Sequence, residues 1–367
     1  MTIFRLLIAS LTALSLLACS DGSNPSAAIA EIVAPEPEEA RPALEIELSE
    51  SPIELMGIAA NFAADLRYGE AERNLLDIYL PDCNAPTPLI IFIHGGGFTS
   101  GDKRNAHNRQ GDNIRESLQN CVAYATISYT LLSIPPADAD LADEPDQGGV
   151  LTSLQDTARA LQFMRYHYDS LNLDMENVAS YGLSAGAGAS LWLGTHDDMA
   201  DPENEDPVLR ESTRIKAVGA LATQSTYDII DWGPILLPIT EPFIGVLGGT
   251  DVPTLAAAVG AENYLLTFLG ATSIDQLDSQ EQLDYRANID MLELMDSGDA
   301  PIYTENFEVS FDNLLNVFLH HALHAIAIKD RADEVGLESV AYSSAPSFPL
   351  EDPSGETLMS FLLRHIL

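Results

Sequence analysis

The sequence predicts an α/β fold in which a mostly parallel sheet is flanked by helices and carries an inserted helical cap. Short apolar runs rich in β-branched and small residues recur along the chain, as expected of strands that are buried on both faces. Stretches whose apolar positions follow helical spacing separate these runs. The length of 367 residues suits one large domain of this kind with an insertion.

Residues 1–18 are predicted to be a signal peptide of the lipoprotein type. Arg5 supplies a short positive region, an apolar stretch follows, and Leu-Leu-Ala stands directly before Cys19. This arrangement resembles a bacterial lipobox, which implies cleavage before Cys19 and lipidation of its thiol. Ser20 follows where an inner-membrane retention signal has Asp, so we expect an outer-membrane anchor facing the periplasm or the exterior. The alternative is an ordinary signal peptide with an incidental cysteine.

The next segment, residues 19–50, is rich in Ala, Pro and Glu and predicts a flexible acidic tether, which leaves residues 51–367 as the folded domain. The whole chain has 56 acidic and 17 basic side chains, a formal charge of −39. Such a surface is well solvated and repels nucleic acid and anionic lipid headgroups, so we expect no nucleic-acid partner. The charge says little about chemistry.

The strand signals follow one another in a regular order. Residues 73–81 alternate in polarity and stop at Pro81, as an early antiparallel strand does. The later runs are continuous in apolar character, which is typical of parallel strands, and read "PLIIFIHGGG", "VAYATISYTL", "NVASYGLSAG", "IKAVGALAT", "APIYTEN" and "ESVAYSS". The stretch "LTSLQDTARALQFMRYHY" is the clearest helix between them.

One interval, residues 224–299, interrupts this order. It has no strand signal, is partly apolar, and ends in an acidic helical stretch. Insertions of this size usually have a function, so we predict a helical cap folded against the loop edge of the sheet. A packing appendage far from any site is the alternative.

The first chemical motif, G-x-S-x-G, spans Gly182 to Gly186 and places Ser184 between an apolar strand and a helix. This context is the one that a nucleophile on a sharp strand-to-helix turn requires. The glycines leave room for close backbone approach, so we expect the Ser184 hydroxyl to project from the carboxyl edge of the sheet.

The second motif is His94-Gly-Gly-Gly97, at the end of another strand. Glycines here let backbone N–H groups face a substrate oxygen that becomes negative during acyl transfer. Gly96 and Gly97 are the predicted donors, and the Ala185 N–H completes the oxyanion hole. A phosphate cradle is the alternative, but neither a Walker lysine nor a G-x-G-x-x-G spacing is present. We expect His94 to shape the loop.

Together with "RYGEAERNLLDIYLP" and "LQDTARALQFMRYHYDSLNLD", these motifs resemble the α/β-hydrolase superfamily over residues 62–221. The closest branch is the HGGG-type bacterial carboxylesterases and lipases, including feruloyl-esterase-like groups. The resemblance implies hydrolysis of a carboxylic ester through a serine acyl-enzyme, without metal or organic cofactor. It also implies the chain order serine, acid, histidine.

The resemblance points to Asp312, after the "APIYTEN" strand, as the acid. Glu305 and Glu308 are rivals because they lie nearer to the end of that strand.

The base is harder to assign, because the loop after the last strand contains no histidine and His365 falls inside the terminal helix. The stretch "FLHHALHA" offers replacements, of which His321 is the first choice and His320 the second. His320 and His324 share a face at i, i+4 spacing, but H-x-x-x-H without further ligands is a weak metal signal, and we predict no metal site. Two of these three histidines should be helix N-terminal or packing residues.

Two further cysteines, Cys83 and Cys121, each precede a predicted core strand. In an oxidising periplasm they are able to pair, and if the strands are neighbours their starts are close. Two buried thiols are the alternative.

We therefore expect a serine carboxylesterase anchored in the bacterial cell envelope that acts on a small-molecule ester. Ser184 is its nucleophile and His321, oriented by Asp312, its base. Two alternatives remain: a degenerate hydrolase fold that binds without turnover, and an amidase or peptidase.

Overall fold

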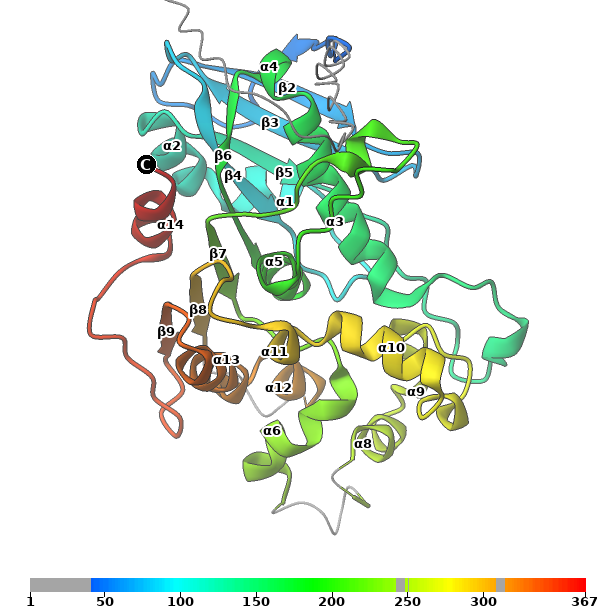
Figure 1. Ribbon diagram of the computed structural model, residues 1–367. Helices are drawn as coiled ribbons and strands as arrows, with labels where there is room; N and C mark the ends of the chain where they lie inside the picture. Colours follow the sequence, from blue (N-terminus) through cyan, green and yellow to red (C-terminus); the bar gives the residue numbers. More distant parts are fainter. Residues whose placement is uncertain (1–40, 242–247, 250, 308–313) are drawn as a thin grey trace, which may run out of the picture. The chain divides into compact units, whose positions relative to one another are not determined.

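The protein is described by a computed structural model that covers residues 41–241, 248–249, 251–307 and 314–367. Its described part contains a nine-stranded sheet in the order β1-β2-β3-β5-β4-β6-β7-β8-β9 (Figure 1). The strands from β1 to β5 pair antiparallel, and those from β5 through β9 pair parallel. The strands are β1 Leu48–Ser49, β2 Ala60–Arg67, β3 Leu75–Pro81, β4 Thr87–Ile93, β5 Ala123–Ile127, β6 Leu173–Leu183, β7 Ala217–Leu221, β8 Ile302–Asn306 and β9 Ser339–Ser343.

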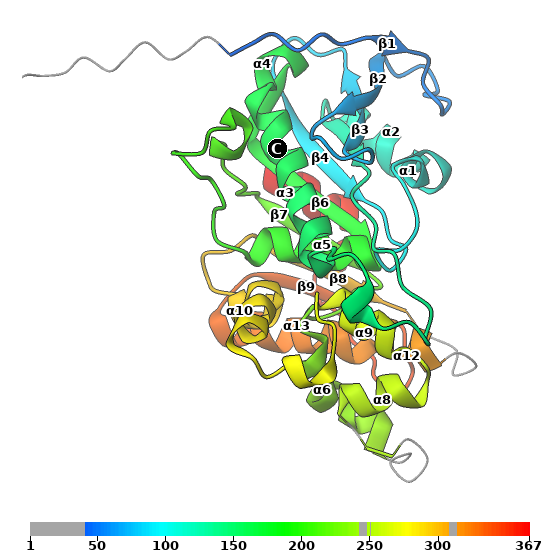
Figure 2. The same cartoon turned by 90° about the vertical axis from the view of Figure 1, so that its right-hand side faces the viewer.

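Helices cover both faces of this sheet, with α3 in front of the strands and α14 behind them in Figure 2. The helices outside the β7–β8 interval are α1 Arg104–Arg109, α2 Gly111–Gln119, α3 Gly149–Tyr166, α4 Tyr168–Leu171, α5 Ala185–Thr195, α12 Leu314–His320, α13 Ala322–Val335 and α14 Leu358–Ile366. The α/β-hydrolase fold class is therefore confirmed.

Side chains of β4 show why the sequence has continuous apolar runs. Ile91 and Ile93 pack into the core shared with α3, α5 and α13. Ile90 and Phe92 alternate with them and pack into the core shared with α2 and α14. All four side chains are buried, because successive residues of a strand point to opposite faces and both faces carry helices.

The strand register brings the predicted motifs to one edge of the sheet. Ile93 at the end of β4 pairs with Gly182 of β6, and Gly182 pairs with Ala220 of β7. The HGGG loop and the serine turn therefore leave the sheet side by side. This is the carboxyl edge, where parallel α/β sheets place their binding sites.

The β7–β8 interval contains the predicted insertion, residues 224–299. Its described residues form helices and loops, and the helices lie together below the sheet in Figures 1 and 2. They are α6 Trp232–Thr240, α8 Val252–Ala258, α9 Glu262–Phe268, α10 Gln280–Ile289 and α11 Met291–Leu294. Arg286 joins α10 to the start of the insertion through Asp228 at 2.8 Å, and Trp192 of α5 donates to the Asn288 carbonyl at 2.8 Å.

The predicted tether boundary at residue 50 lies too far along the chain. Arg41 forms an ion pair with Glu211 at 2.9 Å, the Leu44 N–H donates to Ser170, and β1 pairs with β2. Residues 41–50 therefore belong to the folded unit. Composition alone does not predict these contacts, because each of them joins residues 41–50 to a partner outside that segment.

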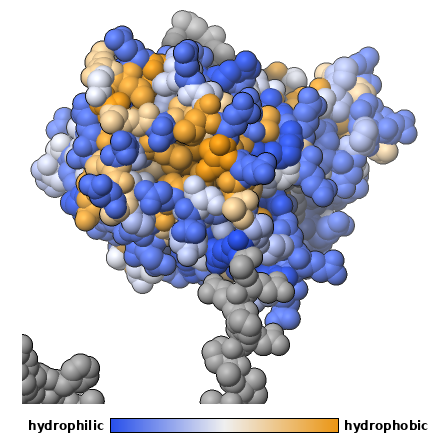
Figure 3. All heavy atoms as spheres, turned by 90° about the horizontal axis from the view of Figure 1, so that it is seen from above, coloured by the Kyte–Doolittle hydropathy of each residue, from blue (hydrophilic) through white to orange (hydrophobic). Residues whose placement is uncertain are grey.

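Cys83 and Cys121 form a disulfide, as the sequence suggested. They precede the adjacent strands β4 and β5, so the topology brings their segments together. Within the described ranges, the helices are too short or too polar to cross a membrane. The face in Figure 3 is largely hydrophilic around an apolar patch, as the high content of acidic residues leads us to expect.

Candidate active site

Ser184 occupies a strained turn between β6 and α5. Its backbone has φ 52° and ψ −121°, a conformation that L-residues rarely adopt. The Ser184 N–H donates to the Leu221 carbonyl of β7 at 2.9 Å, which ties the turn to the sheet. A Cβ at Gly186 would lie 2.0 Å from the Ile93 carbonyl oxygen, so the close approach of β4 requires glycine there.

A histidine reaches this serine from the segment after β8. The Ser184 Oγ lies 2.8 Å from the His320 Nε2, and the His320 Nδ1 lies 2.7 Å from the Asn316 Oδ1. The amide oxygen only accepts, so the Nδ1 carries the proton and the Nε2 lone pair faces the serine hydroxyl. Burial lowers the pKa of His320 below its usual 6.5 and keeps the ring neutral and able to accept a proton.

The geometry corrects our first choice, His321. Its Nδ1 accepts from the Leu323 N–H at 3.2 Å and caps α13, and its ring packs edge-on against Phe348. His324 is fully buried and bonded to Ser225 and to the Phe318 carbonyl. His321 is thus a helix N-terminal residue and His324 a packing residue, in agreement with the expectation that two of the three histidines would have such roles.

A buried amide at the end of β8 holds the backbone that carries the base. The Asn306 Nδ2 donates to the carbonyls of His320 and His321 at 3.3 and 3.1 Å, and to that of Thr223 at 3.0 Å. Its Oδ1 accepts from the Thr223 N–H at 3.0 Å. Asn306 thereby links β8, the residues after β7 and the α12–α13 junction. Our sequence reading missed both Asn306 and Asn316; the i, i+4 spacing of Asn316 and His320 was the available signal.

The predicted acid, Asp312, and its rival Glu308 lie outside the described residues. Glu305, the other rival, accepts a hydrogen bond from Tyr303 two residues before it on β8, at 3.1 Å. His365 lies on α14, where its Nε2 is 3.6 Å from Glu338. Neither contact involves Ser184 or His320.

Two candidate oxyanion donors are the N–H groups of Gly97 and Ala185. Each shares a peptide group with the carbonyl of the preceding residue, and hydrogen bonds to that carbonyl orient the donor. The Gly96 carbonyl accepts from the N–H groups of Thr99 and Ser100, each at 3.1 Å. A trans peptide points its N–H away from its carbonyl, so the Gly97 N–H faces away from residues 99–100. In the same way, the Ser184 carbonyl accepts from residues 187 and 188 of α5, so the Ala185 N–H, in the first turn of that helix, points away from α5.

Gly97, Ser184 and Ala185 line one pocket, whereas Gly96 is not among its lining residues. A Cβ at Gly96 would lie 2.1 Å from the Ser100 carbonyl oxygen, so its glycine is required by the turn itself. Of the predicted donors, Gly97 and Ala185 line the pocket together with Ser184.

Side chains that pack against the HGGG loop hold its conformation. His94 lies in this loop and shapes it, as we expected. Its ring stacks on Tyr129 with centroids 4.2 Å apart, and the Tyr129 hydroxyl donates to the His94 carbonyl at 2.7 Å. Burial lowers the pKa of His94 to about 4, so the ring is neutral. Arg73 donates to the Gly101 carbonyl at 2.6 Å and fixes the end of the loop.

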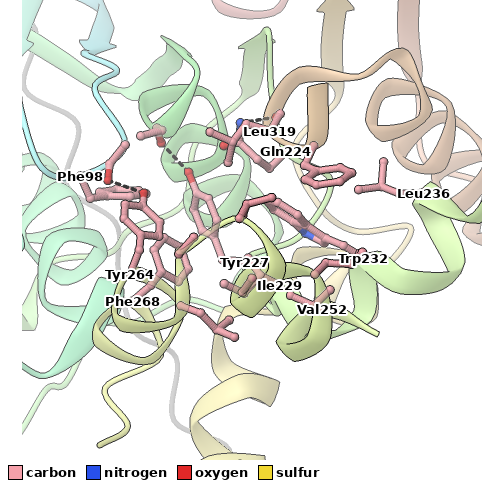
Figure 4. A pocket seen from close by; sticks show the side chains of 18 of the residues that line it. Phe98, Gln224, Tyr227, Ile229, Trp232, Leu236, Val252, Tyr264, Phe268 and Leu319 are labelled. Atoms are coloured by element: carbon pink, nitrogen blue, oxygen red, sulfur yellow. Dashed lines mark hydrogen bonds between the residues drawn. The ribbon is translucent and has the colours of Figure 1, made fainter. Parts of the chain in front are cut away.

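Two tyrosines of the insertion donate hydrogen bonds near the serine, one to the HGGG loop and one to the residue after Ser184 (Figure 4). The Tyr264 hydroxyl donates to the Gly97 carbonyl at 2.8 Å, and the Tyr227 hydroxyl donates to the Ala185 carbonyl. Both rings line the pocket. No sequence pattern predicts these contacts, because they join segments that are far apart along the chain.

Carboxylates gather elsewhere in the described chain, at Asp228, Asp231 and Asp290. Arg286 lies 2.8 Å from Asp228, and the Asp290 carboxylate accepts from the N–H groups that begin α11. The ion pair with Arg286 and the cap of α11 therefore stabilise the fold of the insertion.

Comparison with known proteins finds a family similarity over less than half of the chain. Residues 76–234 match the BD-FAE family model. A probable isoprenylcysteine alpha-carbonyl methylesterase of Arabidopsis thaliana is 24% identical over 157 residues, which cover 42% of this chain and 29% of that protein. The chain thus spans less than a third of that relative.

Solved structures extend the likeness in fold to most of the chain. A truncated carbohydrate esterase from gut microbiota has a TM-score of 0.55 at 15% identity, covering 83% of this chain and 95% of that one. An acetyl ester-xyloside bifunctional hydrolase from Caldicellulosiruptor lactoaceticus has a TM-score of 0.51 at 15% identity, covering 77% and 85%. The chain thus has an α/β-hydrolase fold, and its residues 76–234 match the BD-FAE family model.

Proposed function

We propose that the protein is a serine hydrolase that cleaves a carboxylic ester through an acyl-enzyme. The observation that carries this proposal is the 2.8 Å contact between the Ser184 Oγ and the His320 Nε2, on a strained turn beside the Gly97 and Ala185 N–H groups. A nucleophile, a neutral base and two oriented donors are the groups that acyl transfer needs.

In the proposed reaction, the Ser184 oxygen attacks the ester carbonyl carbon while its proton passes to the His320 Nε2. The carbonyl oxygen becomes an oxyanion and accepts from Gly97 and Ala185. As the bond to the leaving oxygen breaks, His320 returns the proton to that oxygen and the alcohol departs. Water then attacks the acyl-enzyme with His320 again as base, which releases the acid and restores Ser184.

Asn316 orients the base in this scheme. Its oxygen holds the Nδ1 proton of His320, so the ring presents the Nε2 lone pair to the serine. A neutral amide offers less stabilisation to the imidazolium than a carboxylate does. Asp312 remains our proposal for the carboxylate acid.

The relatives support an ester as the substrate, because the names of the plant relative and of both solved structures describe ester cleavage. The alternatives of an amidase or peptidase and of a binding protein without turnover have no observation in their favour. Both make distinct predictions in the experiment below.

The test compares the wild type, Ser184→Ala and the surface control Ser354→Ala on p-nitrophenyl acetate and on a p-nitroanilide. We expect ester turnover and fluorophosphonate labelling in the wild type and in the control. We expect Ser184→Ala to lose labelling and at least about 10³-fold in kcat/KM. Absence of labelling in folded wild type would favour the binding protein, and a higher kcat/KM on the anilide would favour the amidase.

We further propose that Cys19 is lipidated and anchors the protein in the bacterial outer membrane. The pattern before Cys19 supports this proposal. The Cys83–Cys121 disulfide agrees with an oxidising compartment. Metabolic labelling with a palmitate analogue should mark the wild type but not Cys19→Ala, and the variant should leave the membrane fraction. Equal labelling of both would refute the anchor.

A further inference from the structure

We propose that the inserted helices form a binding pocket for the acyl chain of the ester, and that this chain is an uncharged aliphatic group of several carbons. This inference rests on the proposed esterase function and names its substrate class. The pocket extends from Ser184 between the HGGG loop and the helices α6, α8 and α9 (Figure 4).

The walls of the pocket are apolar. Aromatic and aliphatic side chains from four separate segments face it, among them Phe98, Tyr227, Trp232, Leu236, Tyr264 and Phe268. Among the described residues that line it, the polar atoms belong to Ser184, Gln224, the tyrosine hydroxyls and the Trp232 indole, and none of these residues is charged. A charged or heavily hydroxylated group would lose its hydration here, whereas a hydrocarbon chain gains from burial.

The donors of Gln224, Tyr227 and Tyr264 in the lining already have acceptors. Gln224 donates to the Leu319 carbonyl at 2.7 Å, Tyr264 to the Gly97 carbonyl, and Tyr227 to the Ala185 carbonyl. These groups are therefore committed to the protein and offer few bonds to a sugar or a peptide. Trp232 likewise donates from its Nε1 to the Thr226 carbonyl at 2.9 Å and shows its ring to the pocket.

The pocket adjoins the groups that hold the ester carbonyl. Gly97, Ser184 and Ala185 line it, and so do Phe318 and Leu319, which precede the base. The leaving alcohol must lie near the His320 Nε2, because His320 returns the proton to it. We assign the pocket to the acyl chain, and the acyl and alcohol series below test this assignment.

The size of the pocket favours more than an acetyl group. The space that the centres of water-sized spheres can occupy in it is about 90 Å³. Roughly 10–15 Å³ of this measure holds one water molecule, so the pocket has room for a chain of several heavy atoms. An acetyl group would leave most of this apolar surface in contact with water, so each added methylene should bring further burial.

The first experiment varies the acyl group and the alcohol separately. On p-nitrophenyl acetate, butyrate, hexanoate and octanoate, kcat/KM should rise by roughly threefold to fourfold per methylene until the pocket is full. On acetates of ethanol, butanol and hexanol, kcat/KM should change by less than about threefold over the series. A flat acyl profile, or a rise confined to the alcohol series, would overturn the acyl pocket.

The second experiment fills the pocket. Ala256 is buried on α8 and lines the pocket, whereas Ala257 is exposed on the same helix. Ala256→Phe should lower the octanoate-to-acetate ratio of kcat/KM by at least about tenfold, and Ala257→Phe should leave that ratio unchanged. Circular dichroism and thermal unfolding check that both variants are folded. An equal ratio in both folded variants would overturn the proposal.

The two proposals fail in different ways. Turnover of acetate that depends on Ser184, together with a flat acyl profile, would leave the esterase in place and reject the pocket. Absence of turnover on every ester would reject both.

Discussion

Replacing His320 by alanine tests the proposed site most directly. The His320 Nε2 lies 2.8 Å from the Ser184 Oγ, within the distance at which a base takes a proton in acyl transfer. Alanine removes the base and also the group that returns the proton to the leaving alcohol. We therefore expect His320→Ala to lose turnover while the fold is retained.

The size of the loss follows from the role of the ring. Positioned general acid–base catalysis contributes about 10²-fold to 10⁴-fold, which corresponds to about 2.7 to 5.5 kcal/mol in the activation free energy. The oxyanion donors are untouched by the substitution, so a residual rate should persist. Steady-state kinetics on p-nitrophenyl acetate measures kcat/KM, and fluorophosphonate labelling should slow in parallel.

The neighbouring histidine provides the matched control. His321 caps α13 through Leu323, so His321→Ala should cost about 1 to 2 kcal/mol in the free energy of unfolding. Its kcat/KM should stay within about tenfold of the wild type, because its ring bonds to α13 rather than to the serine. Equal losses of kcat/KM in the two variants, or a greater loss in His321→Ala, would refute the reasoning.

Three further predictions concern pH, the oxyanion loop and the disulfide. Burial lowers the pKa of His320 below 6.5 and only the neutral ring accepts the serine proton, so kcat/KM should fall to half its plateau below pH 6.5; half-activity above pH 7 would contradict this. Tyr264→Phe removes a hydrogen bond to the Gly97 carbonyl worth about 0.5 to 1.5 kcal/mol, so kcat/KM on acetate should fall about twofold to tenfold; wild-type kinetics would show that the contact does not orient the loop. The disulfide joins residues 38 apart, so Cys83→Ser/Cys121→Ser should lower the free energy of unfolding by up to about 4 kcal/mol in urea titrations, and an unchanged value would show that the bridge does not stabilise the fold.

Local motifs account for the part of the site that was predicted correctly in position. The turn at Ser184 and the glycines before it need only a few neighbouring residues, because steric limits on φ and ψ and close backbone contacts act over short stretches. The alternation of strands and helices is equally readable, because burial on both faces leaves continuous apolar runs in the sequence.

The base could not be chosen in this way. His320 and Ser184 are 136 residues apart, and His320 and His321 are adjacent in the sequence. Adjacent residues on a helix point about 100° apart, so the orientation of the helix decides which ring meets the serine. Here α12 ends at His320 and the chain turns at His321, with Asn306 bonded to both carbonyls.

The sequence by itself thus determined the sheet, the nucleophile turn and the HGGG loop, because each depends on backbone sterics or on burial that a short segment records. The tertiary structure decided the identity of the base, the tyrosine contacts to Gly97 and Ala185, and the apolar pocket. Each of these depends on side chains that distant segments bring together, and the packing that sets their relative orientation is not recorded within any one segment.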